Sequence, residues 1–172
     1  MAFEYCILGP FQLEEVLDLE AEILAALERP DLLRRNSRAM WLACLNAPHT
    51  ALGVRVEGKL VALAVLYIPE PGSDEDLSVL LHQPACASLK SANYKICLVA
   101  PRHRGHGLQQ QLGLRLEEYA HRQGVALICS TASPHNPASI RSLENLGYRL
   151  STTLTKYGFT RNLYYKIVNG EW

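Results

Sequence analysis

The sequence predicts a single α/β (α+β) domain, residues 1–172, with helices flanking a mixed, largely antiparallel sheet. Two pairs of apolar segments joined by short turns, within 51–67 and 149–168, are typical of β-hairpins, whose strands run antiparallel. Between 94 and 130, an apolar segment, an amphipathic segment and a second apolar segment follow one another, and such a strand–helix–strand unit has parallel strands. The length of 172 residues is enough to bury one full core.

The first quarter of the chain predicts one strand and two helices. Residues 3–8 are apolar enough for a strand, and apolar residues recur at helical spacing from 12 to about 28. Pro30 breaks this period, so a second helix is expected over 31–45. Its polar face carries Arg34, Arg35 and Arg38. We interpret that face as solvated, and contact with an acidic substrate or a phosphate is the alternative.

A hairpin and a long loop follow. Strands are expected at 51–56 and 60–67, on either side of a short turn at Glu57-Gly58-Lys59. The segment 69–76 is rich in proline and acidic residues and predicts a loop. Its three acids are Asp74, Glu75 and Asp76. Ordinary surface acids are the favoured interpretation, and attraction of a cationic amine is the alternative. A helical turn or an excursion is expected within 76–91.

The stretch 94–124 carries the strongest functional signal. A buried strand over 94–99 ends at Ala100-Pro101, and a basic, glycine-spaced segment, 102–107, leads directly into an amphipathic helix that begins at Leu108. The first N–H groups of a helix have no partner within the helix, and the helix dipole adds partial positive charge there. Glycine lets the backbone approach a phosphate closely. The arrangement predicts an anion site.

The last third of the chain predicts a strand, a helix and a hairpin. A strand parallel to the central one is expected over 125–130. Asn136 precedes Pro137 and can cap a helix that runs to about Leu146. Two β-rich segments, about 149–155 and 162–168, then form a terminal hairpin.

Composition limits the classes of partner. Lys plus Arg and Asp plus Glu number 17 each, so no global field favours nucleic acid or a membrane surface. The longest apolar run, 60–68, is too short to span a bilayer. Five widely spaced cysteines show no metal-ligand spacing, which favours buried thiols in a reducing compartment and no metal. No signal pattern is present at the N-terminus, so a cytoplasmic location is expected.

The glycine turn resembles the acetyl-CoA signature of the GNAT superfamily of N-acetyltransferases, an R/Q-x-x-G-x-G/A turn between a strand and a helix. One register begins at Arg102 and matches fully through Gly105 and Gly107. The other begins at Arg104 and places Gln109 where the family has a small residue. We prefer the second because it also aligns Val99, Pro101, Leu108 and Leu112 with the family pattern, which requires the Gln109 side chain to point away from the pyrophosphate. Asn136, Ser139 and Leu146-Gly147-Tyr148 resemble a second family pattern.

This resemblance implies a fold and a donor site. It implies a GNAT-like sheet whose parallel central strands splay apart and admit the pantetheine arm of acetyl-CoA, a co-substrate used without a metal. Asn136 is expected to hydrogen-bond that arm or to serve only as a helix cap. The residues expected to bind the donor are Leu98, Val99, Arg102, Arg104, Gly105, His106, Gly107, Leu108, Gln109, Asn136 and Ser139. A homodimer is a common assembly for this fold.

The resemblance also exposes three departures from the family's catalytic pattern. Backbone N–H groups near Leu98 and Val99 are expected to polarise the thioester carbonyl. Leu143 stands where many relatives carry a catalytic tyrosine, and Asn93 stands where some carry a glutamate on the central strand. Thr131 stands where others carry a second glutamate. Tyr157 is therefore the first candidate for the proton carrier, because the terminal hairpin borders the acceptor site in this fold. The other candidates are Tyr94, His82 and His135, and Cys97 is a candidate nucleophile that is otherwise a buried thiol.

Three functions follow as hypotheses. The first is transfer of an acetyl or acyl group from acetyl-CoA to a primary amine of a small molecule or peptide, by direct attack. The second is a CoA-binding regulatory module without activity, which the three departures favour. The third, a dinucleotide-binding domain, is disfavoured because the glycine turn lies mid-chain and has no G-x-G-x-x-G pattern. The sequence does not identify the acceptor.

Overall fold

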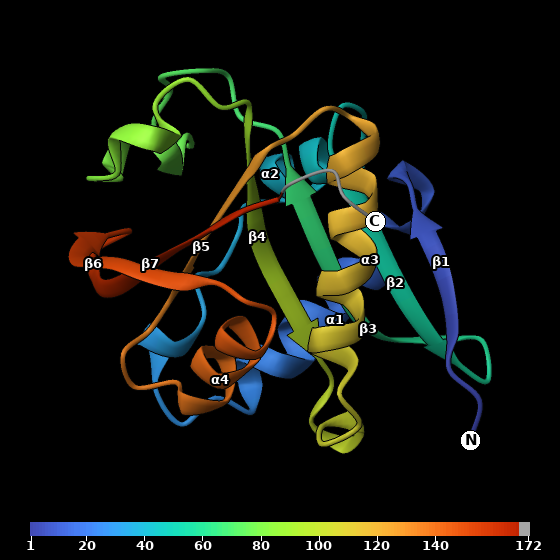
Figure 1. Ribbon diagram of the computed structural model, residues 1–172. Helices are drawn as coiled ribbons and strands as arrows, with labels where there is room; N and C mark the ends of the chain where they lie inside the picture. The colour runs from blue at the N-terminus through green and yellow to red at the C-terminus, as the bar shows by residue number, and fades with distance from the viewer. Residues whose placement is uncertain (169–172) are drawn as a thin grey trace.

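A mixed seven-stranded sheet organises residues 1–168, the part of the chain that the computed structural model describes (Figure 1). The strand order is β1-β2-β3-β4-β5-β7-β6, and every neighbouring pair is antiparallel except β4 and β5. The strands are β1 (Glu4–Leu8), β2 (Thr50–Val56), β3 (Lys59–Tyr67), β4 (Ser91–Val99), β5 (Leu127–Ala132), β6 (Arg149–Lys156) and β7 (Phe159–Ile167). The expected mixed, largely antiparallel sheet with one parallel pair is confirmed.

The parallel pair opens along its length. Ladder pairing between β4 and β5 covers only Ser91–Asn93 against Leu127–Cys129. Beyond that point β4 keeps its pairing with β3, whereas β5 pairs with β7 to its end. A register shift leaves Lys95 as an extra residue on β4, and a bulge of this kind bends the strand that carries it. The two central strands therefore splay apart, as the sequence resemblance implied.

Helices cover both faces of the sheet. In Figure 1, α3 lies in front of β3 and β4, whereas α1 and α2 lie behind the sheet and α4 lies near the beginning of α3. The α-helices are α1 (Leu13–Ala25), α2 (Arg38–Cys44), α3 (Leu108–Arg122) and α4 (Pro137–Asn145). Short 3₁₀ turns are η1 (Pro10–Gln12), η2 (Pro30–Leu32), η3 (Leu77–Leu80), η4 (Pro84–Cys86) and η5 (Pro101–His103). Gly113 permits close packing of α3 on α4, because a Cβ there would lie 2.6 Å from the Leu146 side chain.

The single helix expected over 31–45 was wrong. Only α2, which begins at Arg38, is α-helical, and Leu33 has an extended backbone. Ser37 caps α2 by accepting a hydrogen bond from Met40 N, and Asn36 N donates to the buried carboxylate of Glu20 at 3.0 Å. These bonds stop the helix from extending backwards, so residues 33–37 form a connecting loop.

Both hairpins turn through two residues with positive φ. Glu57 and Gly58 have φ of 50° and 79°, and Tyr157 and Gly158 have φ of 59° and 78°. Such turns match the twist of their strands. The terminal strands are consequently longer than expected, because residues assigned to the connection belong to β6 and β7.

Asp76 is a structural acid rather than the expected surface acid. It is 5% exposed, and its carboxylate accepts hydrogen bonds from Gly72 N, Ser78 N and Ser91 Oγ. Burial alone would raise the pKa of Asp76, but these bonds together hold it below its usual value. The carboxylate thus fixes the loop that leads from β3 to η3.

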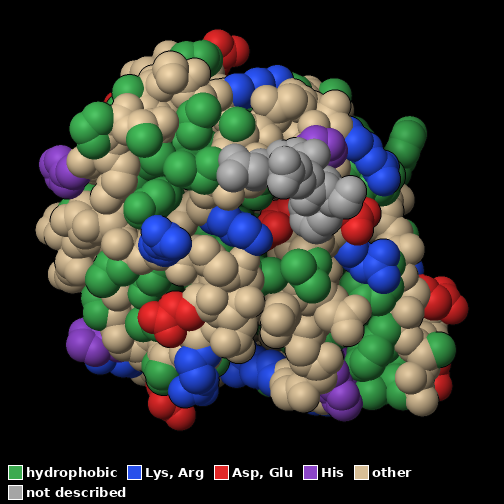
Figure 2. All heavy atoms as spheres, viewed as in Figure 1, with side chains coloured by type: hydrophobic (Ala, Val, Ile, Leu, Met, Phe, Trp, Pro, Cys, Tyr) green, Lys and Arg blue, Asp and Glu red, His purple; other side chains and the backbone are tan. Residues whose placement is uncertain are grey.

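The surface shown in Figure 2 carries basic and acidic side chains interspersed over the same face. This distribution agrees with the formal net charge of zero. None of the helices within residues 1–168 combines the length and the apolar character needed to cross a bilayer.

Candidate functional site

A cavity of about 760 Å³ lies between the splayed strands. Its walls come from β4, β5, the beginnings of α3 and α4, the segment 27–36 and the β6–β7 turn. Most of the residues predicted to bind the donor or to catalyse transfer line it. They are Leu98, Val99, Arg104, Gly105, Gly107, Leu108, Gln109, Asn136, Ser139 and Tyr157.

The glycine turn presents the start of α3 to this cavity. Gly105 and Gly107 have φ of 81° and 70°, a backbone region that other residues rarely adopt, and Gly107 is the N-cap of α3. The first helical bond runs from Gln111 N to Gly107 O, so the N–H groups of Leu108, Gln109 and Gln110 have no partner within the helix. These donors and the helix dipole create a site for an anion.

Arg102 and His106, two of the predicted donor-binding residues, do not line the cavity. The His106 ring packs against Phe3 with 5.4 Å between ring centroids. His103 lines the cavity instead, and its Nδ1 is buried without a hydrogen-bond partner within residues 1–168. The sequence pattern located the turn correctly but could not assign which of its basic side chains face inwards.

Gln109 links the beginnings of α3 and α4. Its Nε2 donates to Ser139 Oγ at 3.5 Å, and Asn136 Oδ1 accepts from Ser139 N at 3.1 Å as the cap of α4. The hydroxyl of Tyr94 donates to the carbonyl of Gln109 at 3.1 Å. Burial raises the pKa of Tyr94 well above its usual value, and the hydroxyl is engaged in the fold, so Tyr94 is a poor proton carrier.

The amides of β4 point alternately to its two sides. Ala100 N donates to Val61 O at 2.8 Å, so the amide of Leu98, two residues earlier and opposite Leu63, also faces β3. The amides of Val99 and Cys97 therefore face the side from which β5 has diverged. Of the two amides predicted to polarise a thioester, that of Val99 is directed to the cavity and that of Leu98 into the sheet.

Tyr157 lines the cavity from the β6–β7 hairpin turn. The guanidinium carbon of Arg34 lies 3.7 Å from the centre of its ring. Burial and the nearby carboxylate of Glu75 raise the pKa of the Tyr157 hydroxyl, and Arg34 offsets part of that effect. The hydroxyl thus stays protonated at neutral pH, as a proton donor requires.

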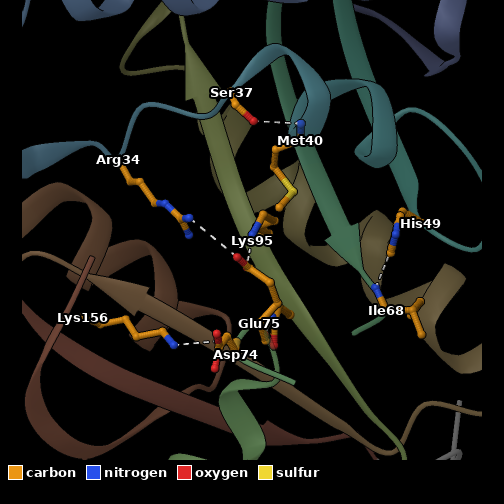
Figure 3. A network of polar contacts seen from close by, with 10 residues as sticks. Arg34, Ser37, Met40, His49, Ile68, Asp74, Glu75, Lys95 and Lys156 are labelled. Carbon is orange, nitrogen blue, oxygen red and sulfur yellow. Dashed lines mark hydrogen bonds and ion pairs between the residues drawn. The ribbon is translucent and has the colours of Figure 1, made fainter. Parts of the chain in front are cut away.

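Figure 3 shows Arg34, Lys95 and Glu75 converging from three separate segments. Lys95 Nζ lies 2.5 Å from Glu75 Oε2, and Arg34 Nη2 lies 3.6 Å from Glu75 Oε1. Burial of Glu75 would raise its pKa, but the contacts with Lys95 and Arg34 lower it overall. Glu75 is therefore a paired carboxylate, contrary to the expectation of an ordinary surface acid, and Arg34 does not belong to a solvated helix face.

The remaining candidates for proton transfer lie in less suitable places. His82 and His135 are exposed and do not line the cavity. Cys97 does line it, but burial raises the pKa of its thiol to about 12, which keeps it protonated. Leu143 and Thr131 line the cavity without an acidic group, and Asn93 is buried and donates to the carbonyl of Glu75 at 2.5 Å.

Sequence reasoning missed Arg161, which lines the cavity on β7 although it is only 4% exposed. A local signal existed. Alternation along β7 places Arg161 on the same face as Leu163, which is fully buried. A charged residue on the buried face of a strand indicates a site rather than a surface.

Comparison with known proteins identifies relatives of this fold. Residues 13–148 match the Acetyltransferase (GNAT) family. The L-2,4-diaminobutyric acid acetyltransferase of Nocardia farcinica is 29% identical over 121 residues, which cover 70% of this chain and 54% of that protein. The chain thus aligns with about half the length of this curated relative.

Solved structures share the whole arrangement at low sequence identity. The putative acetyltransferase yncA of Salmonella typhimurium, determined with acetyl-CoA, has a TM-score of 0.72 and 16% identity, over 99% of this chain and 96% of that one. NAA60 of Arabidopsis thaliana, also determined with acetyl-CoA, has a TM-score of 0.73 and 14% identity, over 98% of this chain and 100% of that one.

Proposed function

This chain belongs to the GNAT family of acetyltransferases, and we propose that it transfers an acetyl group from acetyl-CoA to a primary amine by direct attack. The observation that carries the proposal is the cavity between β4 and β5, whose walls include an open helix N-terminus and a protonated tyrosine. An extended ligand with a charged diphosphate and a reactive thioester fits such a cavity.

The donor lies along β4. The free N–H groups at the start of α3, together with Arg104, hold the diphosphate. The pantetheine arm occupies the gap between β4 and β5, next to Asn136 and Ser139 at the start of α4. This placement puts the thioester near the middle of β4.

The chemistry uses backbone and side chain together. A neutral amine attacks the thioester carbonyl, and the N–H groups of Val99 and Cys97 stabilise the negative charge that develops on its oxygen. Collapse of the tetrahedral intermediate breaks the C–S bond. The Tyr157 hydroxyl then gives its proton to the leaving thiolate, and the proton that the amine loses restores Tyr157 through solvent. Cys97 forms no covalent intermediate, because its thiol stays protonated.

A small amine is the favoured acceptor. The Nocardia relative is named for acetylation of L-2,4-diaminobutyric acid, a small primary amine. Leu27, Leu32 and Leu33, together with Tyr157 of the hairpin turn, line the part of the cavity that we assign to the acceptor. This mainly apolar lining suits a small molecule.

The proposal is tested by following CoA release from acetyl-CoA with a panel of primary amines, with mass-spectrometric detection of the acetylated product. Amine-dependent release supports it. Binding of acetyl-CoA without transfer to any amine would instead favour the CoA-binding regulatory module, for which the departures at Leu143, Asn93 and Thr131 are the argument.

A further inference from the structure

Arg161 is a buried cation with unused hydrogen-bonding capacity. Only 4% of the residue is exposed, and its Nε and Nη2 atoms are buried without a hydrogen-bond partner within residues 1–168. The Phe159 ring, with its centroid 5.5 Å from the guanidinium carbon, offers the charge some compensation but accepts no hydrogen bond in the plane of the guanidinium. An unpaired buried charge is costly, so its presence beside a cavity requires a reason.

The two unsatisfied atoms form one edge of the guanidinium. Nε and Nη2 present parallel N–H groups whose spacing matches the two oxygens of a carboxylate. The same pair of atoms is used elsewhere in this molecule, where Arg29 Nε and Nη2 donate to the two carboxylate oxygens of Asp31 at 2.8 and 3.2 Å. Arg161 therefore carries a bidentate edge that pairs with none of the described residues.

The carboxylates near this end of the cavity are already engaged. Asp31 acts on Arg161 electrostatically, but its oxygens accept from Arg29 and from Ser133 Oγ. Glu75 is held by Lys95 and Arg34. The cationic side chains of Arg34, Lys95 and Arg161 all line the cavity, whereas neither Asp31 nor Glu75 does.

We propose that the acceptor is a small amine that also carries a carboxylate, and that the guanidinium of Arg161, on the cavity wall, binds this carboxylate. The inference rests on the proposed function and names its substrate class, an amino acid or a close analogue. An acceptor carboxylate supplies the missing partner of Arg161. A polyamine would instead bring a further cation towards Arg34 and Lys95.

The test compares matched amines that differ only in the carboxylate. L-2,4-diaminobutyrate is paired with 1,3-diaminopropane, L-lysine with 1,5-diaminopentane, and L-phenylalanine with phenethylamine, and kcat/KM is measured by CoA release for each. The expected result is a preference of at least about 30-fold for the carboxylate member of the pair that contains the best acceptor, since losing one partner of a buried, hydrogen-bonded charge pair has an effect of this size.

Two variants assign the preference to Arg161. In Arg161→Met, the KM of the carboxylate-bearing acceptor should rise about 30-fold or more and the preference should disappear, while the KM of acetyl-CoA stays within about twofold. Arg161→Lys keeps the charge but lacks the bidentate edge, so it should restore only part of the preference. Arg149→Gln, an exposed substitution on β6 of the same hairpin, serves as the matched control and should leave both KM values unchanged.

The outcomes separate the inference from the proposed function. Acetylation of amines without preference for the carboxylate member would overturn the inference and leave the proposed function intact. A selective rise in the KM of acetyl-CoA in Arg161→Met would also overturn it, since Arg161 would then serve the donor. Acetylation of none of the amines would overturn both. A thermal shift of Arg161→Met with acetyl-CoA verifies that the variant is folded.

Discussion

The guanidinium carbon of Arg34 lies 3.7 Å from the centre of the Tyr157 ring, which joins the loop before α2 to the turn of the terminal hairpin. A cation over an aromatic face is attracted to it. Both residues line the cavity, and the contact holds Tyr157 on its wall. Arg34 therefore links the two segments that frame the proposed acceptor site.

Replacing Tyr157 with phenylalanine is expected to lower kcat about 100-fold, because a general acid contributes about 10² to 10⁴ in rate. The variant should leave the KM of acetyl-CoA unchanged. Tyr119→Phe, on α3 and outside the residues that line the cavity, is the matched control. Equal turnover of Tyr157→Phe and the control would remove Tyr157 from the mechanism.

The pH profile gives a second test of Tyr157. Burial raises the pKa of its hydroxyl above the ordinary value of 10.0, so the protonated, active form persists through neutral pH. In the wild-type protein kcat should fall only at a pH above 10, where the hydroxyl ionises. At lower pH, kcat should increase with pH as the amine is deprotonated, and this increase should be present in both the wild-type protein and Tyr157→Phe. An alkaline fall that persists unchanged in Tyr157→Phe would assign it to another group.

Gly107→Ala tests the anion site. A non-glycine residue in the left-handed region costs about 1–2 kcal/mol, and Gly107 has φ of 70° with open space within 4 Å of the position that a Cβ would occupy. Gly58→Ala imposes the same strain, at φ of 79°, in a turn that does not line the cavity. Both variants should lose similar stability in urea unfolding. Only Gly107→Ala should raise the KM of acetyl-CoA, by about 10-fold or about 1.4 kcal/mol.

Cys97→Ala should retain activity within about threefold, since positioning of the donor is carried by the backbone and not by this thiol. Burial raises the pKa of Cys97 to about 12, so the thiolate that a covalent route needs is scarce at neutral pH. Mass spectrometry of the wild-type protein after mixing with acetyl-CoA should detect no acetyl-enzyme. Detection of acetyl-Cys97 that decays on addition of amine would replace direct attack with a two-step mechanism.

Lys166→Met is expected to destabilise the fold by about 3–5 kcal/mol at neutral pH, because it leaves a buried carboxylate unpaired. Lys166 Nζ lies 2.7 and 2.9 Å from the two oxygens of Glu117, which is 1% exposed, and also donates to Leu146 O. Lys59→Met removes an exposed ion pair with Glu22 and should cost less than about 1 kcal/mol. Urea unfolding of both variants provides the comparison.

The loss of stability in Lys166→Met should depend on pH, and the direction of that dependence follows from the pKa of Glu117. Burial raises the pKa of Glu117 above 4.5, so the folded state holds this proton more tightly than the unfolded state. The free energy of unfolding therefore falls as the pH rises from 4.5 through the folded-state pKa, and Lys166 limits the fall. Lys166→Met should thus be closer to the wild-type protein at pH 5 than at pH 8. A loss independent of pH would mean that Glu117 does not titrate in this way.

Local patterns were enough to predict the backbone elements around the glycine turn. The strand over 94–99, the turn with Gly105 and Gly107 and the helix cap at Asn136 each depend on neighbouring residues, and the structure places them as expected. The helix expected over 31–45 was wrong because a distant contact decides its start. The bond from Asn36 N to Glu20 crosses between two segments and leaves no local signature.

The proposed acceptor half depends on such distant contacts throughout. Arg34, Lys95 and Glu75 meet only because a loop, a strand bulge and a second loop converge. The sequence shows each as an ordinary charged residue. Arg161 was missed as well, because the strand was expected to begin at 162, whereas in the structure β7 begins at Phe159 and places Arg161 on the buried face with Leu163. Only the structure shows that its Nε and Nη2 atoms lack partners.

The most direct test of the central claim is acetyl transfer itself, measured with purified protein, acetyl-CoA and the amine panel beside a thermal-unfolding series. Acetyl-CoA at about 100 times its dissociation constant should raise the unfolding temperature by about 5–10 °C, whereas NAD should not. We expect this rise together with amine-dependent CoA release and an acetylated amine. No thermal shift with acetyl-CoA and no acetylated product would contradict the proposed function.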